Sequence, residues 1–130
     1  MRNLIYTENG TFRHGVPPGA YSVTVSRGPE YTMAVVPIIV KEGVETTLQA
    51  VLKRVVRTPG WIAANFANYT AGSSQASDVS AKGRVLNLLG EGIEFAPSTD
   101  IETIIDLAPA IRELGAESWL ATCPGVRLNW

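Results

Sequence analysis

Residues 60–100 read GWIAANFANYTAGSSQASDVSAKGRVLNLLGEGIEFAPSTD, and this stretch decides the fold of the chain. It contains two short apolar runs, residues 62–66 and 93–96, separated by a segment with the apolar spacing of a helix. Each apolar run ends in polar residues. A strand–helix–strand order predicts parallel strands, and in parallel α/β folds the loops that follow the strands carry the chemistry. We therefore expect a functional rim at these two strand ends.

The segment between the two runs has the start and stop signals of a helix. Ser80 is a suitable N-cap, and the apolar residues of 81–89 share one face before a glycine. A second helix is predicted within residues 104–114, with Pro109 in or near its first turn, and a third strand at 119–123. The second half of the chain therefore reads as repeated strand and helix units.

The first part of the chain has the alternating pattern of antiparallel strands. Four strands of a small sandwich are predicted, at residues 11–13, 21–26, 33–40 and 45–53. Pro37 interrupts one of them, and proline in a sheet indicates an edge or bulge position. The chain is thus predicted to change from antiparallel to parallel structure along its length.

Charge divides the chain at the same place. Lys and Arg outnumber Asp and Glu seven to four in residues 1–60 and trail them four to eight in residues 61–130. We place the boundary between two parts at residues 57 and 58. Neither part has a basic stripe, so no nucleic-acid partner is expected. No apolar run approaches the roughly 20 residues that span a bilayer, and no signal peptide is recognised. No compartment is favoured.

The residues that usually build metal or covalent sites are scarce. His14 is the single histidine and lies in a predicted turn, so an exposed histidine is a simpler interpretation than a metal ligand. Cys123 is the single cysteine, which excludes an internal disulfide and leaves a small apolar residue as the default. Phosphate-binding, dinucleotide-binding and nucleophile-elbow motifs are absent from the sequence.

Three strings in the second half carry a resemblance to a known family. GWIAANFANYT (60–70), RVLNLLGEGIEFAPSTD (84–100) and LATCPGV (120–126) resemble the start of a PHP (polymerase and histidinol phosphatase) metallohydrolase of the CehA/McbA, carbaryl hydrolase-like type. GTFRHGVPPGAYSVTVSRGPEY (10–31) is similar to the carboxypeptidase-regulatory-like sandwich that precedes such barrels. The resemblance implies an α+β chain in two parts. Residues 1–57 would form a partial antiparallel β-sandwich, and residues 58–130 the first βα units of a TIM-like barrel, both truncated.

Intact members of that family bind zinc, manganese or iron through histidine and carboxylate ligands. Their metal-bound water attacks phosphoesters, carbamates or esters. The matched ligand positions in this chain are Ala67, Tyr69, Gln75, Ile101 and Arg127. Alanine and isoleucine have no ligating atom, and arginine places a permanent positive charge where a metal would sit. The resemblance therefore implies an inactive relative without a bound cofactor.

What remains at the strand ends is polar. The residual rim consists of Asn65, Asn68, Thr99, Asp100 and Glu102. An ion pair from Arg127 to Asp100 or Glu102 is predicted in place of the metal, and binding of a small ligand at this rim is a further hypothesis. The alternative function is a non-catalytic structural or binding module. It would be completed by self-association or by another chain, because an incomplete barrel leaves a sheet edge and an apolar face uncovered.

Overall fold

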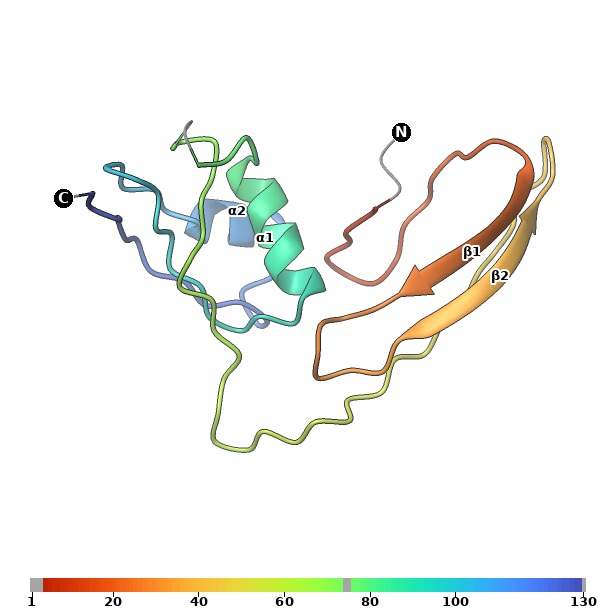
Figure 1. The fold of residues 1–130 in the computed structure, drawn as a ribbon, viewed down its shortest axis with the longest axis horizontal. Coiled ribbons are helices and arrows are strands. Elements are labelled where there is room, and N and C mark those ends of the chain that lie inside the picture. Colours follow the sequence, from red (N-terminus) through yellow and green to blue (C-terminus); the bar gives the residue numbers. More distant parts are fainter. Residues whose placement is uncertain (1–3, 74–75, 130) are drawn as a thin grey trace.

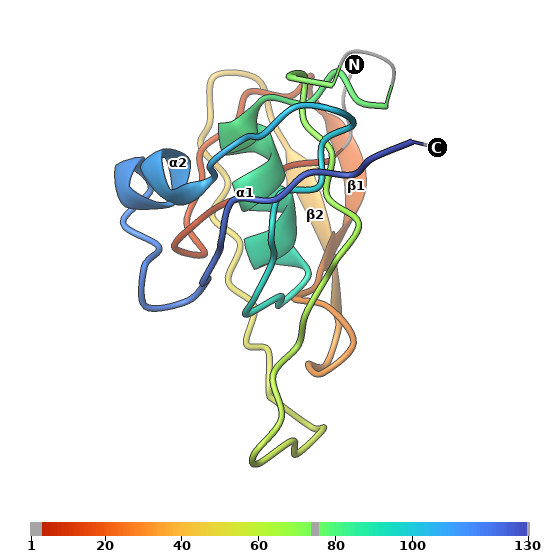
Figure 2. The same cartoon turned by 90° about the vertical axis from the view of Figure 1, so that its left-hand side faces the viewer.

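The computed structural model describes residues 4–73 and 76–129, which form a small α+β fold (Figure 1). The first half of the chain contributes two antiparallel strands, and the second half contributes two short helices beside three extended segments. The first helix lies between the extended segments and the two strands in both views (Figures 1 and 2). We keep the names first half and second half for residues 4–57 and 58–129.

Strands β1 (Gly19–Val25) and β2 (Ala34–Val40) pair antiparallel, with Gly19 opposite Val40 and Val25 opposite Ala34. Both segments were predicted, and the alternation is confirmed because half-buried residues alternate with exposed ones along each strand. Pro37 lies opposite Ser22. In this two-stranded sheet each strand has one unpaired edge, so a proline that lacks an N–H is tolerated.

The other two predicted strands are not formed in the first half. Residues 11–13 and 45–53 have no strand assignment, so the four-strand prediction was wrong for these two segments. Residues 45–53 bond to β2 through the hydroxyl of Thr46, which donates to the carbonyl of Ile39 over 3.3 Å. At their far end they are joined to the segment before β2, where Thr32 N donates to the Lys53 carbonyl over 2.8 Å. Alternation alone does not make a strand when few backbone hydrogen bonds support it.

The three extended segments of the second half lie around residues 64, 95 and 121, and they run parallel. Ala64 bridges Phe95, and Phe95 bridges Ala121, both in parallel orientation. The predicted parallel order is thereby confirmed, although each contact is an isolated bridge rather than a strand. The pairing with the third segment stays short: Ala96 N donates to the Ala121 carbonyl over 3.0 Å, but the Ala96 carbonyl accepts from the side-chain hydroxyl of Thr122 over 2.7 Å and, among the described residues, from no backbone N–H. The described strands, helices and bridges do not make up a closed barrel or a complete sandwich.

The helices begin and end close to the predicted signals. Helix α1 (Ala81–Gly90) is capped by Ser80, whose hydroxyl accepts a hydrogen bond from Gly83 N over 3.1 Å. Helix α2 (Ala108–Glu113) is shorter than predicted, because the proline sits in its first turn and fixes where it starts. Gly115 follows with a φ of 61°, a left-handed conformation that ends the helix.

The hydrophobic core lies between these helices and the extended segments. Its buried members are Val85, Leu88, Leu89, Ala96, Leu107, Ala110, Ile111, Ala116 and Leu120. Every one of them belongs to the second half. Among the described residues of the first half, no side chain is buried. No helix in the described part of the chain is long and apolar enough to cross a membrane.

The two halves meet at a close backbone contact. Gly28 has a φ of 67°, and a Cβ added to it would lie 1.9 Å from the carbonyl oxygen of Glu91. A Cβ added to Gly92 would likewise lie 3.2 Å from the carbonyl oxygen of Arg27. Only glycine permits both the left-handed conformation and this approach. The turn after β1 therefore packs directly against the turn after α1.

Candidate functional site

Three of the matched ligand positions come together where the extended segments end. The Arg127 guanidinium donates to the hydroxyl of Tyr69 over 2.6 Å, although 58 positions separate the two residues. Ile101 forms a parallel bridge with Arg127. Positions 69, 101 and 127 therefore lie at one end of the parallel segments, as the strand-end argument expects.

The predicted ion pair of Arg127 is wrong. The ion pairs within the described part of the chain are Arg13–Glu45, Arg54–Glu30 and Lys82–Glu113. Arg127 instead bonds to the predicted partners through its backbone: its N–H donates to the Asp100 carbonyl over 3.0 Å, and its carbonyl accepts from Glu102 N over 2.9 Å. The side chain of Arg127 is exposed, whereas Asp100 is fully buried, so their charged groups do not meet.

Asp100 is used to hold a loop. Its carboxylate accepts hydrogen bonds from the backbone N–H of Thr70 over 2.7 Å and from the Thr70 hydroxyl, which lies 3.1 Å from both oxygens. A buried carboxylate is stable in a fold when donors of this kind satisfy it. The Ser73 hydroxyl holds the same loop, because it accepts a hydrogen bond from the backbone N–H of Ile101 over 3.1 Å. Asp100 therefore fixes the chain after position 69 and presents no free base.

Asn68 joins the first two segment ends and is fully buried. Its side-chain nitrogen donates to the carbonyl of Asn65 over 2.6 Å and to that of Pro97 over 3.0 Å. Its backbone N–H donates to the Thr99 hydroxyl over 2.8 Å, and Thr99 N donates back to the Asn68 carbonyl over 2.9 Å. The side-chain oxygen of Asn68 has no hydrogen-bond partner among the described atoms. These hydrogen bonds hold the loop at residues 65–68 to the loop at residues 97–99, and we call this set of bonds the Asn68 clamp.

The remaining rim positions contribute less. Ala67 is exposed, and its N–H donates to the Asn65 side-chain oxygen over 2.9 Å. Glu102 is exposed and has a φ of 53°, the one positive value for a non-glycine residue in the described chain. Gln75 lies outside the described residues. Of the five matched positions, the structure joins Tyr69, Ile101 and Arg127 through a hydrogen bond and a bridge, and among the described residues neither kind of link connects Ala67 to them.

The described part of the chain contains no group of three or more histidine, cysteine, aspartate or glutamate side chains close enough to hold a metal ion. His14 and Cys123 are both exposed. The rim offers amide, hydroxyl and phenol oxygens, a buried carboxylate that is already bonded, and a guanidinium. This arrangement can bind polar groups through Arg127, and its one carboxylate without a hydrogen-bond partner among the described residues is the exposed Glu102, which has no imidazole or metal-binding group beside it to help activate a water.

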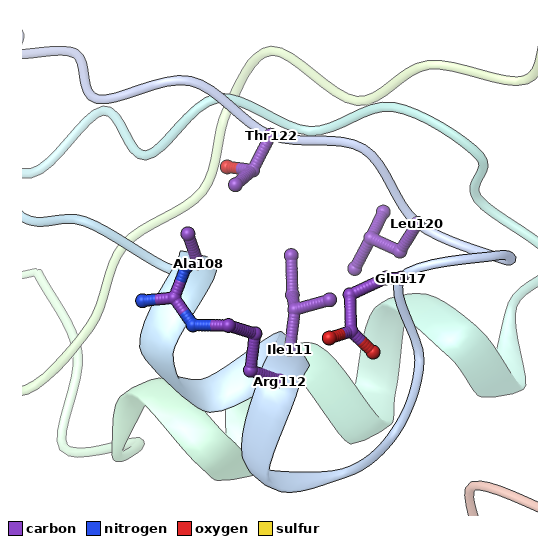
Figure 3. A pocket seen from close by; sticks show the side chains of 6 residues that line it. All are labelled: Ala108, Ile111, Arg112, Glu117, Leu120 and Thr122. Carbon is purple, nitrogen blue, oxygen red and sulfur yellow. The ribbon is translucent and has the colours of Figure 1, made fainter.

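Two cavities lie away from this rim. A hollow of about 180 Å³ opens between α2 and the third extended segment, with Ile111 at its centre and Arg112 and Glu117 at its sides (Figure 3). A larger cleft of about 420 Å³ opens between the two halves, beside Arg27 and Trp119. None of the predicted site residues lines either cavity. Sequence reasoning missed both, because their lining residues form no local motif.

No protein-family model, curated protein or solved structure matches this chain. The resemblance to PHP metallohydrolases therefore rests on the quoted strings and their register.

Proposed function

We propose that this chain is a non-catalytic relative of PHP metallohydrolases, in which an Arg127–Tyr69 contact stands where active members hold metal. The observation that supports the proposal is the 2.6 Å hydrogen bond between these side chains, beside the Ile101–Arg127 bridge. The strand ends of such a barrel would bring these distant positions together, and this agreement supports the proposal. The residues at those positions are chemically unsuited to metal.

Arginine at this place changes the chemistry of the site. A guanidinium supplies the positive charge that a divalent cation would supply, but it stays protonated and has no coordination position for a water. Tyr69 is occupied as its hydrogen-bond acceptor. The pair therefore joins two segment ends in place of a metal and provides no nucleophile. Without an activated water, neither phosphoesters nor carbamates are hydrolysed.

The test is to restore the expected ligands. A variant with Ala67→His, Tyr69→His, Gln75→Asp, Ile101→His and Arg127→Glu should bind zinc or manganese in calorimetric titration. The parent chain, dialysed and analysed for metals, should hold none in stoichiometric amount. Hydrolysis should remain absent from the variant, because intact relatives use further ligands from later strands.

The matched control carries the first four substitutions and keeps Arg127. Its positive charge should repel the cation, so the control should bind metal much more weakly than the full variant. If the full variant binds zinc no better than the parent chain, the proposed correspondence of positions is wrong.

A second candidate function, a module completed by association, is favoured by the size of the exposed surface. The chain exposes 9175 Å². A compact monomer of 14.0 kDa exposes about 6,700 Å² by the usual scaling with mass. The excess on this one chain, about 2,500 Å², is larger than the roughly 1,000 Å² that each partner contributes to an obligate interface of about 2,000 Å². Among the exposed residues are Trp61 and Phe66 of the first extended segment, 79% and 67% accessible.

Sedimentation equilibrium tests this second candidate. Self-association should be present in the parent chain and weakened by Phe66→Ser, since this side chain contacts little within the chain beyond the ring of Phe95, 6.0 Å away. Met33→Ser removes an equally exposed apolar side chain from the first half and serves as the control. A parent chain that stays monomeric at all concentrations, alone and with candidate partners, would contradict the association module.

A further inference from the structure

The cleft between the two halves has the size of a ligand site. Its volume is about 420 Å³, whereas small-molecule sites usually span about 300–1,000 Å³. It lies where the turn after β1 faces residues 117–121 of the second half. Apolar side chains of Leu89, Ile93 and Leu120 line it together with the rings of Tyr31 and Trp119. The cleft is separate from the rim at the ends of the extended segments.

Most of the charges in this cleft are already partnered. Glu30 forms an ion pair with Arg54 over 2.5 Å. Glu94 accepts a hydrogen bond from the N–H of Ala63 over 2.9 Å. No ion pair in the described part of the chain includes Glu94, so its negative charge is not compensated. Arg27 and Glu117 have no hydrogen-bond or ion-pair partner among the described residues, and Glu117 is the more exposed of the two. Arg27 is the half-buried cation of the cleft.

The guanidinium of Arg27 is fixed by aromatic rings rather than by an anion. Its central carbon lies 5.1 Å from the ring centre of Tyr31 and 4.9 Å from that of Trp119. Among the described residues, no hydrogen bond or ion pair engages its N–H groups. Stacking uses the faces of a guanidinium and leaves the donors on its edge available. These donors reach the cleft without an acceptor in the described part of the chain, and an oxyanion can accept from a guanidinium edge two at a time.

We propose that this cleft binds a small organic anion, a carboxylate or a phosphate monoester attached to an apolar body. Arg27 binds the oxyanion through the edge of its guanidinium, held in place by Tyr31 and Trp119. The apolar body lies against Trp119, which is 54% exposed and therefore has ring surface free for contact. Glu94 and Glu117 line the same cleft, and their negative charges oppose the anion. The site draws on both halves, so ligand binding also stabilises their contact.

Three probes test the proposal by NMR titration of the full chain: benzoate, phenyl phosphate and inorganic phosphate. The first two share an aromatic body and differ in the oxyanion, whereas the third lacks the body. Benzoate or phenyl phosphate, or both, should give saturable shifts at the Trp119 indole N–H and should bind more tightly than inorganic phosphate. Binding of one aromatic probe alone assigns the ligand to the carboxylates or to the phosphate monoesters.

Three variants connect the shifts to the side chains. Arg27→Gln should weaken binding of the aromatic probe about tenfold to a hundredfold, the usual range for a hydrogen bond to a charged group. Arg57→Gln removes an exposed arginine outside the cleft and should leave binding unchanged. Glu117→Gln should tighten binding up to about fivefold, because an exposed like charge is removed.

Glu117→Gln keeps the test decisive if Arg27→Gln fails to fold, since the glutamate is exposed and a gain in affinity does not arise from lost packing. Two outcomes overturn the proposal. In the first, neither benzoate nor phenyl phosphate gives saturable shifts at Trp119. In the second, the parent chain binds a probe with an affinity that neither Glu117→Gln nor a folded Arg27→Gln changes.

Discussion

Replacing Gly28 with alanine tests the contact between the two halves most directly. The new Cβ would lie 1.9 Å from the Glu91 carbonyl oxygen, and the φ of 67° is unfavourable for any L side chain. The left-handed conformation costs about 1–2 kcal/mol. The steric overlap adds about 1–3 kcal/mol, the range for overpacking of a well-packed contact. The free energy of unfolding should therefore fall by about 2–5 kcal/mol, a large fraction of the usual total of about 5–15 kcal/mol.

Gly43→Ala is the matched control. Gly43 has nearly the same φ, 69°, but nothing lies within 4 Å of its ideal Cβ position. Its alanine variant should lose only the conformational part, about 1–2 kcal/mol. Urea unfolding followed by tryptophan fluorescence measures both values. If Gly28→Ala and Gly43→Ala lower the free energy of unfolding equally, the turn after β1 does not pack against the turn after α1. The two halves would then not be held together at the cleft.

Three further changes probe the rim by the same unfolding measurement. Asn68→Ala leaves two carbonyls without their donor and should lower the free energy of unfolding by about 2–3 kcal/mol. The control, Asn129→Ala at an exposed position, should change it by less than about 0.5 kcal/mol. Equal effects of the two variants would contradict the role of the Asn68 clamp in joining the loops. Thr70→Val keeps the side-chain shape but removes the hydroxyl donor to the buried Asp100, so a loss of about 1.5–3 kcal/mol is expected, and no loss would show that the carboxylate is satisfied otherwise. Glu102→Asn should raise stability by up to about 1 kcal/mol, because asparagine adopts a positive φ more readily; a decrease would mean that the glutamate side chain has a role of its own.

Local signals predicted α1 well and α2 in place but not in length. The cap at Ser80 and the apolar face that follows it are contained within ten residues, so α1 was predictable in type and extent. The parallel order of the extended segments followed from the helices between them. Residues 45–53 have the same alternation as β1 but lack backbone partners over most of their length. Alternation reports which faces differ in polarity, and it does not report whether a neighbouring strand is available.

The site was predictable in position but not in its contacts. The strand-end rule placed positions 69, 101 and 127 together, and Tyr69 and Arg127 do meet. The ion pair to Asp100 failed because the N–H and hydroxyl of Thr70, on a different loop, hold that carboxylate in the interior. No sequence pattern shows which of several nearby donors a carboxylate will face. The stacking of Arg27 on Trp119 likewise joins residues far apart in sequence and had no local signal.

The placement of every buried hydrophobic residue in the second half has a consequence for how the molecule opens. Strands β1 and β2 have no buried apolar side chain, and two-stranded sheets are marginally stable by themselves. Their amides should therefore exchange with solvent through an opening that leaves α1 and the core intact, with a free energy below that of global unfolding. The first half then behaves as a separate foldon attached at the Gly28–Glu91 contact, and an anion in the adjacent cleft slows its exchange without protecting the core further.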